Sequence, residues 1–353
     1  MISTIAIGGL AKRLVEEPPT YKLPDLAPVV FLADLILFLP VLIILGYTLG
    51  HVYPTLAAVE DPLPAYEALS MNDDNLPKDD NDPIRVTAEP GKPVTGSIRS
   101  INRLLRSYGG WRVSFRGLGY AVVIGILTVS TTGFIALAPF IPTRIAHLLT
   151  LIALAPLSTT WTHFIITPPA APDAARRSFF RRVPRAGKVY AATWFPTFLL
   201  WAAAHAAVVL PVALGRLIGL SLPTAGQPPA ATVPNYDGAD LGKLLCVAGV
   251  SVALQALLVI PAHAALTRVQ ASLLPADEDP VVPFDRSFGG RVEPEVVSGK
   301  GFATFGAALK TMPLASWGRI YLLRIKIFAV TVAAYLVMSV IVALELVAMK
   351  KRD

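Results

Sequence analysis

Six ionisable side chains lie within or beside long apolar runs of this 353-residue chain: Asp34, His205, Arg216, His263, Arg268 and Glu345. Ionisable groups in such runs are costly and are therefore candidates for function. Three of them lie near the ends of their runs and can also extend to the membrane surface: Arg216, Arg268 and Glu345. We interpret four as candidates for lining a substrate site: Asp34, His205, His263 and Arg268. For Asp34 a position at the interface, and for His205 a bond to a backbone carbonyl, remain alternatives.

Enzymatic chemistry has no recognisable motif in this sequence. The chain has five histidines, no two of them at the spacing of helical metal ligands: His51, His147, His163, His205 and His263. It has no Ser/His/acid arrangement, phosphate loop or nucleotide fingerprint. The single cysteine, Cys246, excludes an internal disulfide and a zinc–thiolate site. We therefore expect a protein that is not an enzyme and that holds no metal or cofactor.

The composition is that of a polytopic membrane protein. Hydrophobic residues make up 54% of the chain and charged residues only 16%, whereas soluble domains have roughly 25% charged residues. The net charge of +7 is concentrated in loops beside apolar runs, as expected for contact with anionic lipid headgroups. No water-facing segment is long enough to form a basic nucleic-acid-binding domain.

Six runs are long enough, at about 20 mostly apolar residues each, to cross a membrane as helices: 28–54, 117–138, 143–168, 190–220, 241–270 and 320–348. The connections after the first, third and fifth runs are long and carry nearly all the loop charge. We therefore expect these three loops on one side of the membrane. Residues 92–116 and the Phe302–Met312 stretch repeat apolar residues at helical spacing, which predicts amphipathic surface helices.

The long loops suggest partners. Residues 60–90 are acidic and polar, which predicts a disordered segment that can bind a protein partner. Pro64 and Tyr66 within it form a near match to the Pro-Pro-x-Tyr ligand of WW domains. Four arginines in the first and second long loops are predicted to contact anionic lipid headgroups: Arg103, Arg106, Arg181 and Arg182.

Three prolines near the ends of the first, third and fifth runs recur at intervals of 102 and 105 residues: Pro54, Pro156 and Pro261. Each removes one helical hydrogen bond and bends its helix, so we interpret them as structural kinks. Their period predicts three tandem repeats of two helices. The predicted divisions are an N-terminal segment 1–27, repeats at 28–138, 143–220 and 241–348, and a basic tail 349–353.

Two motifs resemble those of the mitochondrial carrier family. That family ends its odd helices with proline, an acid, a base and often a further Arg-x-Gln. Here Pro261, Arg268 and Gln270 match, whereas His263 and Leu266 replace the acid and the base. The family's motif at the start of even helices is matched, without its acid, by four residues of the first repeat: Gly110, Phe115, Arg116 and Gly117.

The resemblance implies six helices in three repeats around a central substrate site, within a mitochondrial membrane. It also implies a gate of ion pairs between residues two and five positions after each proline. In this chain the first of those positions are Leu56, Ser158 and His263, and the second are Val59, Trp161 and Leu266. The family's gate pairs are therefore missing.

Two functions remain as expectations. The missing gate pairs favour a non-classical carrier-fold protein of mitochondria that acts in membrane organisation, fusion or protein insertion. The alternative is a transporter that moves a small metabolite across a mitochondrial membrane. The sequence leaves both the substrate and the choice between outer and inner membrane open.

Overall fold

The computed structural model describes residues 27–61, 93–169, 185–220, 238–275, 278–294, 297 and 299–350. Over these residues the regular structure is entirely helical, which confirms the prediction of an all-α chain. Several sequence predictions fall outside the described residues: the WW-type motif at Pro64 and Tyr66, the loop arginines Arg181 and Arg182, most of the acidic loop 60–90, most of segment 1–27, and the end of the tail.

Five helices are long and apolar enough to cross a membrane: Pro28–Val59, Gly110–Ile135, Ala186–Leu217, Asp240–Ser272 and Leu314–Ala348. The third predicted span, 143–168, is not continuous. It is divided into α8 (Thr143–Ala153) and α9 (Ala155–Ile166), which meet at 57°. Pro156 follows the break directly, and a proline within a helix removes a hydrogen bond and clashes with the preceding turn. The described chain therefore has five candidate spans, or six if the bent pair crosses as one.

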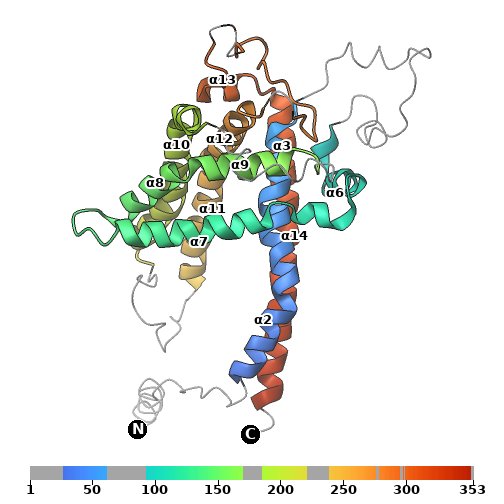
Figure 1. Ribbon diagram of the computed structural model, residues 1–353. Coiled ribbons are helices and arrows are strands. Elements are labelled where there is room, and N and C mark those ends of the chain that lie inside the picture. Colours follow the sequence, from blue (N-terminus) through green and yellow to red (C-terminus); the bar gives the residue numbers. More distant parts are fainter. Residues whose placement is uncertain are drawn as a thin grey trace, which may run out of the picture.

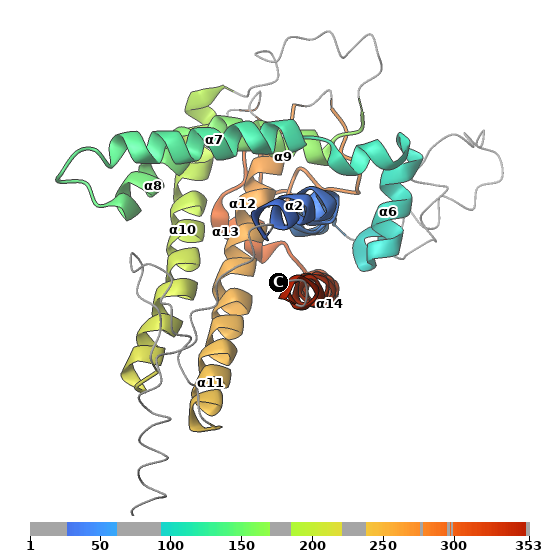
Figure 2. The ribbon, with the colours of Figure 1, turned by 90° about the horizontal axis from the view of Figure 1, so that it is seen from below.

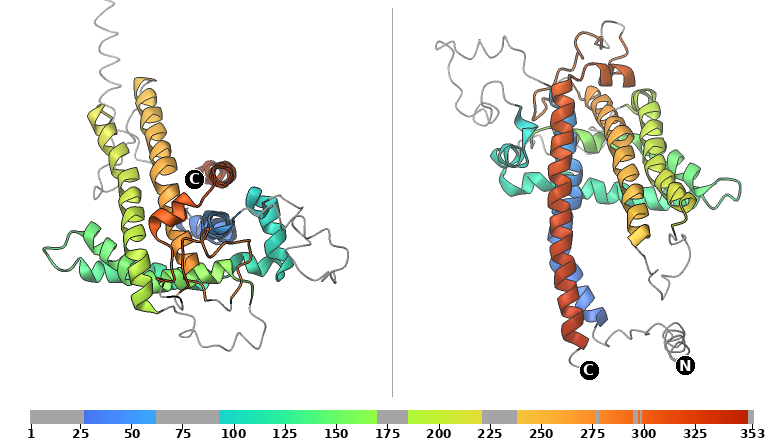
Figure 3. Two further views of the ribbon diagram at one scale, coloured as in Figure 1. Left: turned by 90° about the horizontal axis from the view of Figure 1, so that it is seen from above. Right: turned by 180° about the vertical axis from the view of Figure 1, so that it is seen from behind.

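The helices form three antiparallel pairs that extend in different directions from a common meeting point (Figures 1 and 2). In the first pair, α2 (Ala27–Ile43) lies beside α14 (Leu314–Lys350), as Figure 3 shows from behind. The second pairs α7 (Leu118–Ile135) with α8, and the third pairs α10 (Ala186–Leu217) with α11 (Gly238–Leu254).

The meeting point is formed by the proline-containing ends of three chain segments. These are α3 (Tyr53–Val59), α9 and α12 (Ile260–Ser272), and each of them contacts the other two. We call this meeting of α3, α9 and α12 the hub. The starts of α7, α10 and α14 also lie toward the hub (Figure 1).

Pro54, Pro156 and Pro261 occupy equivalent places, since each is the second residue of its hub helix. The hub helices α3 and α12 each follow a π-helix, η1 (Ile44–Val52) or η5 (Gln255–Val259). Because proline has no N–H, a change of helical register just before it accommodates the missing hydrogen bond. This equivalence agrees with the predicted threefold repeat, which stays a prediction.

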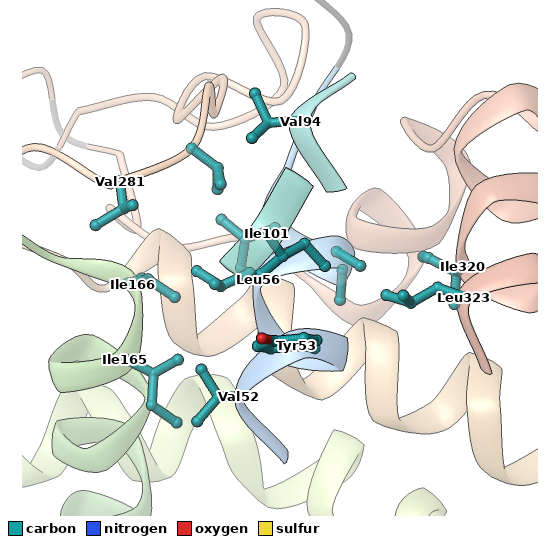
Figure 4. Packing of buried hydrophobic residues seen from close by; sticks show 14 of the residues in the cluster. Val52, Tyr53, Leu56, Val94, Ile101, Ile165, Ile166, Val281, Ile320 and Leu323 are labelled. Atoms are coloured by element: carbon teal, nitrogen blue, oxygen red, sulfur yellow. The ribbon is translucent and has the colours of Figure 1, made fainter. Parts of the chain in front are cut away.

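The hydrophobic core lies at the hub (Figure 4). All seven residues of α3 are buried, and Leu56 belongs to one buried cluster with Ile101, Ile166 and Leu323, which come from three other helices. Away from the hub the long helices present apolar side chains outward, and α7 has no buried residue at all. Apolar side chains exposed along such long helices are suited to contact with lipid tails.

A short helix in the first long loop differs from its prediction as a membrane-surface helix. The helix is α6 (Ile98–Ser107), and Ser97 and Ser100 form a capping box at its start. Its apolar face is buried in the core through Ile101, Leu104 and Leu105, whereas Arg103 and Arg106 are exposed. The helical spacing correctly indicates one apolar face, but that face packs on protein instead of on lipid.

The burial of this face gives a stability prediction. Replacing Leu104 with alanine removes a fully buried side chain, so we expect the folded state to lose about 2–5 kcal/mol. Thermal unfolding of the detergent-purified protein, followed by tryptophan fluorescence, measures the loss. Arg103→Ala on the exposed face of the same helix is the control and should unfold close to the wild type. Equal midpoints for the two variants would contradict the packing of α6 against the hub.

Candidate functional site

A buried ion pair joins α12 to the end of α3 at the hub. Arg268 of α12 is only 1% exposed, and its Nη1 lies 2.8 Å from Oδ1 of Asp61, just beyond α3. The same nitrogen donates to the carbonyl of Ala58 at 3.3 Å, and Nη2 donates to the Thr311 hydroxyl at 3.3 Å. The guanidinium thus connects α12 to the end of α3 and to α13 (Phe305–Lys310).

The loop after α12 encloses this pair. The Arg268 guanidinium lies 5.1 Å from the ring centre of Phe288 and 5.7 Å from that of Phe284, within range of cation–π attraction. The backbone N–H of Asp285 donates to the Asp61 carboxylate at 3.1 Å. Burial acts to raise the pKa of Asp285, but hydrogen bonds from Ser287 and Gly289 and the charge of Arg268 outweigh it and hold that pKa below its ordinary value.

A second buried ion pair lies beside the first. Glu60 is 2% exposed, and its Oε2 lies 3.1 Å from Nη1 of Arg319 on α14. The backbone N–H groups of Val94 and Thr95 donate to the two oxygens of Glu60 at 2.6 and 3.0 Å, and the Thr95 hydroxyl also binds it. Several hydrogen bonds to both partners are what a buried ion pair needs to offset its desolvation cost.

Neutral hydrogen bonds join α9 to α12 at the hub. Nε2 of His163 donates to the carbonyl of Gln270 at 2.8 Å, because that carbonyl can only accept. The Thr162 hydroxyl donates to Oε1 of Gln270 at 2.7 Å, and Nε2 of Gln270 donates to the Ser158 hydroxyl at 3.2 Å. The glutamine side chain and backbone therefore connect α12 to α9.

Next to these contacts lies a cavity of about 350 Å³ between η1, α3, α7, α8, α9, α10 and α12, with a mainly apolar wall that carries a set of polar side chains. Four of the chain's five histidines line it: His51, His147, His205 and His263. Six hydroxyl side chains contribute as well: Thr55, Thr128, Ser158, Thr162, Thr197 and Thr267. The cavity is within the size range of small-molecule sites, about 300–1,000 Å³.

The cavity histidines are held by aromatic and backbone contacts. Nδ1 of His205 donates to the Trp201 carbonyl at 2.9 Å, and the two rings lie 4.5 Å apart. The rings of His147 and His205 are 6.0 Å apart, and those of His51 and Trp161 are 5.5 Å apart. Nε2 of His205 is consequently the nitrogen left for another partner. Within the described residues no three His, Cys, Asp or Glu side chains are grouped to hold a metal ion.

The four residues predicted to line a substrate site lie in three different places in the structure. His205 and His263 both line the cavity, as does the family-motif residue Gln270. Arg268 instead forms the hub ion pair and is absent from the cavity lining. Asp34 is 7% exposed on α2, far along the chain from the hub, and its carboxyl group lies near that of Glu345 on α14.

The remaining family-motif residues have structural positions. Gly117 begins α7 at a positive φ of 81°, and an added Cβ would lie 2.8 Å from the Tyr47 hydroxyl and 3.1 Å from Trp161. Gly110 also has a positive φ, of 73°. The Arg116 guanidinium donates to the carbonyl of Thr167, and Phe115 packs edge-on against Trp111. A glycine is needed at Gly117 for both its conformation and the close approach.

The ion pairs are what the sequence interpretation missed. Glu60 and Asp61 were assigned to the disordered acidic loop 60–90, which is wrong for these two residues because both are fixed by arginines. Charge pairs are missing at the carrier family's gate positions, two and five residues after each hub proline, but the chain forms ion pairs at other positions of the hub. Asp61 and Arg268 each follow their hub proline by seven residues, and His163 follows Pro156 by the same interval. This shared interval of seven residues is the sequence feature that could have indicated that the three side chains meet at the hub.

The Arg268–Asp61 pair is testable by a double-mutant cycle with Arg268→Met and Asp61→Leu. Either single change leaves a buried, unpaired group and should cost about 3–5 kcal/mol. The double variant should lose less than the sum, with a coupling of at least about 1 kcal/mol. Arg286→Met and Asp279→Leu are the matched control, because that pair is 3.7 Å apart with Asp279 almost fully exposed. Purely additive losses at Arg268 and Asp61 would contradict the hub pair.

Comparison with protein-family models, with curated proteins and with solved structures gave no significant match. The resemblance to mitochondrial carriers therefore stays a prediction from the motifs. The function has to be argued from the cavity and the hub contacts of this chain.

Proposed function

We propose that this chain is a membrane transporter that binds a small polar solute in the histidine-lined cavity. The observation that carries the proposal is the cavity itself: hydroxyl, imidazole, amide and indole groups gather in a space of about 350 Å³ among helices whose outer faces are apolar. Polar groups in membrane proteins characteristically face an interior pathway. The proposed mitochondrial location rests on the carrier resemblance alone.

The position of the hub supports transport. Along α12, Leu266, Thr267 and Gln270 line the cavity, whereas Arg268 between them forms the ion pair with Asp61. The contacts between the ends of α3, α9 and α12 therefore lie beside the cavity, and Gln270 takes part in both. Alternating access would require these contacts to open, and charged and hydrogen-bonded contacts between helix ends can be broken and remade.

The expectation of a role in membrane fusion or protein insertion depended on the missing gate pairs. The Arg268–Asp61 pair is a charge contact between α12 and the end of α3, although it does not lie at the carrier family's gate positions. The absence of the family's gate pairs is therefore a weaker argument against transport. A solute transporter is therefore the preferred function. We also propose that Arg103 and Arg106, both exposed on α6, contact anionic lipid headgroups.

Filling the cavity tests the proposal. Ala204 lines the cavity, so Ala204→Phe should occupy much of the solute space. Val208→Phe, on the outward face of the same helix, is the matched control because Val208 is 62% exposed. In liposome uptake assays with a panel of metabolites, we expect uptake of at least one solute by the wild type and the Val208→Phe variant, and loss of uptake in Ala204→Phe. Uptake that is absent for every solute, or unaffected by Ala204→Phe, would refute transport through this cavity.

A further inference from the structure

A second cavity of about 650 Å³ lies between α2, η1, α3, α6, η3 (Gly110–Phe115) and the start of α7. It shares no lining residue with the histidine-lined cavity. Leu39, Ile44 and Trp111 belong to its wall and are exposed, so it is open to the surroundings of the protein. We call it the α2–α6 groove. Its volume is within the range of ligand sites.

The walls of the groove are fixed by contacts within the chain. The Thr48 hydroxyl donates to the Ser114 carbonyl at 3.1 Å, and the Tyr47 hydroxyl donates to the carbonyl of Arg116, so that η1 is held against η3. Helix α6 is held through another of its faces, where Leu104 is fully buried in the core. A groove with fixed walls can accept a ligand without the cost of ordering them.

The groove changes from apolar to cationic along its length. Ile98, Asn102 and Arg106 line it from α6 and recur every four residues, so they share one face of that helix. This face therefore leads from an apolar side chain to an amide and a guanidinium. The part of the wall formed by α2 and the start of η1 is apolar: Leu39, Pro40, Ile43 and Ile44.

The α6 end of the groove belongs to a strongly basic stretch of chain. Residues 92–116 contain six basic side chains and no acidic one. Arg106 lines the groove itself, and Arg112 is exposed beside the exposed ring of Trp111 at the groove's edge. Tryptophan is enriched at the interface between the headgroups and the hydrocarbon of a membrane. This end of the groove is consequently suited to a negatively charged headgroup.

The apolar part of the groove continues the exposed apolar surface of α2, which extends away from the hub (Figure 1). That surface is suited to contact with lipid tails. A ligand that matches both ends must therefore carry an apolar chain and an anionic head. A free phosphate ion would match only the α6 end, and a hydrocarbon without a headgroup would match only the α2 end.

We propose that the α2–α6 groove binds one anionic phospholipid molecule, with its phosphate at Asn102 and Arg106 and one acyl chain along α2. The contact proposed above for Arg103 and Arg106 concerns the membrane surface in general, whereas the groove holds a single lipid in a defined place. A guanidinium can bind two phosphate oxygens at once. The inference does not depend on transport through the histidine-lined cavity.

Native mass spectrometry of the full-length chain in detergent tests this binding. Dioleoyl phosphatidylglycerol, dioleoyl phosphatidylcholine and dioleoylglycerol are titrated separately. We expect saturable binding of one phosphatidylglycerol molecule, weaker binding of phosphatidylcholine, and the weakest binding of dioleoylglycerol, which has no phosphate. An excess of inorganic phosphate should not displace the lipid. Arg106→Gln should weaken phosphatidylglycerol binding by about 10- to 100-fold, since a hydrogen bond to a charged group is lost.

Matched variants separate the groove from general effects of charge and bulk. Arg291→Gln makes the same change of net charge at an exposed arginine outside the groove and should bind as the wild type does. Leu39→Trp fills the apolar part and should weaken binding at least about 10-fold, whereas Leu37→Trp, at an exposed residue of α2 outside the lining, should not.

Equal lipid affinity in Arg106→Gln and Arg291→Gln would overturn the headgroup position. Equal affinity in Leu39→Trp and Leu37→Trp would overturn the placement of the acyl chain, and displacement by inorganic phosphate would assign the site to a free anion. Lipid binding that appears only when residues 64–90 are replaced by a short Gly-Ser linker would assign the groove to that acidic segment. No binding of phosphatidylglycerol would overturn the inference, while metabolite uptake would still decide the proposed function.

Discussion

A guanidinium buried where helix ends converge needs a counter-charge, and Asp61 supplies it for Arg268. Without that carboxylate, α12 could not bring Arg268 against the end of α3. An unpaired buried charge costs several kcal/mol, against a total stability of about 5–15 kcal/mol for a typical protein. The Asp61 pair holds α12 against the end of α3, the Glu60 pair holds α14 there, and neutral hydrogen bonds join α9 to α12.

The molecule consists of the packed hub and of the three helix pairs that extend from it, whose outer faces are apolar. Lipid tails are as apolar as leucine, so helices in a membrane associate through close packing and polar contacts more than through the hydrophobic effect. The arrangement follows this rule: α7 has no buried residue, while Gln270, Thr162 and His163 connect helix ends at the hub. The cavity forms between these two regions, where polar groups are already required for assembly.

The buried charges at the hub serve assembly. Arg268 and Arg319 are neutralised by acids of the same chain, so their charges hold helices together.

The sequence alone determined the local features. Apolar runs define most of the helices, and proline chemistry accounts for the break beside Pro156 and for the changes from π-helix to α-helix beside Pro54 and Pro261, because both effects depend only on neighbouring residues. His205 and His263 could be selected as candidates because ionisable groups in apolar runs are conspicuous.

Only the tertiary structure decided what those features contact. Helical spacing shows that α6 has an apolar face, but protein and lipid attract such a face equally, so its burial in the hub could not be read from the pattern. Asp61 and Arg268 are separated by 207 residues, and nothing local indicates that they pair. The histidines of the cavity likewise come from four different segments, and only the convergence of the helices brings them together.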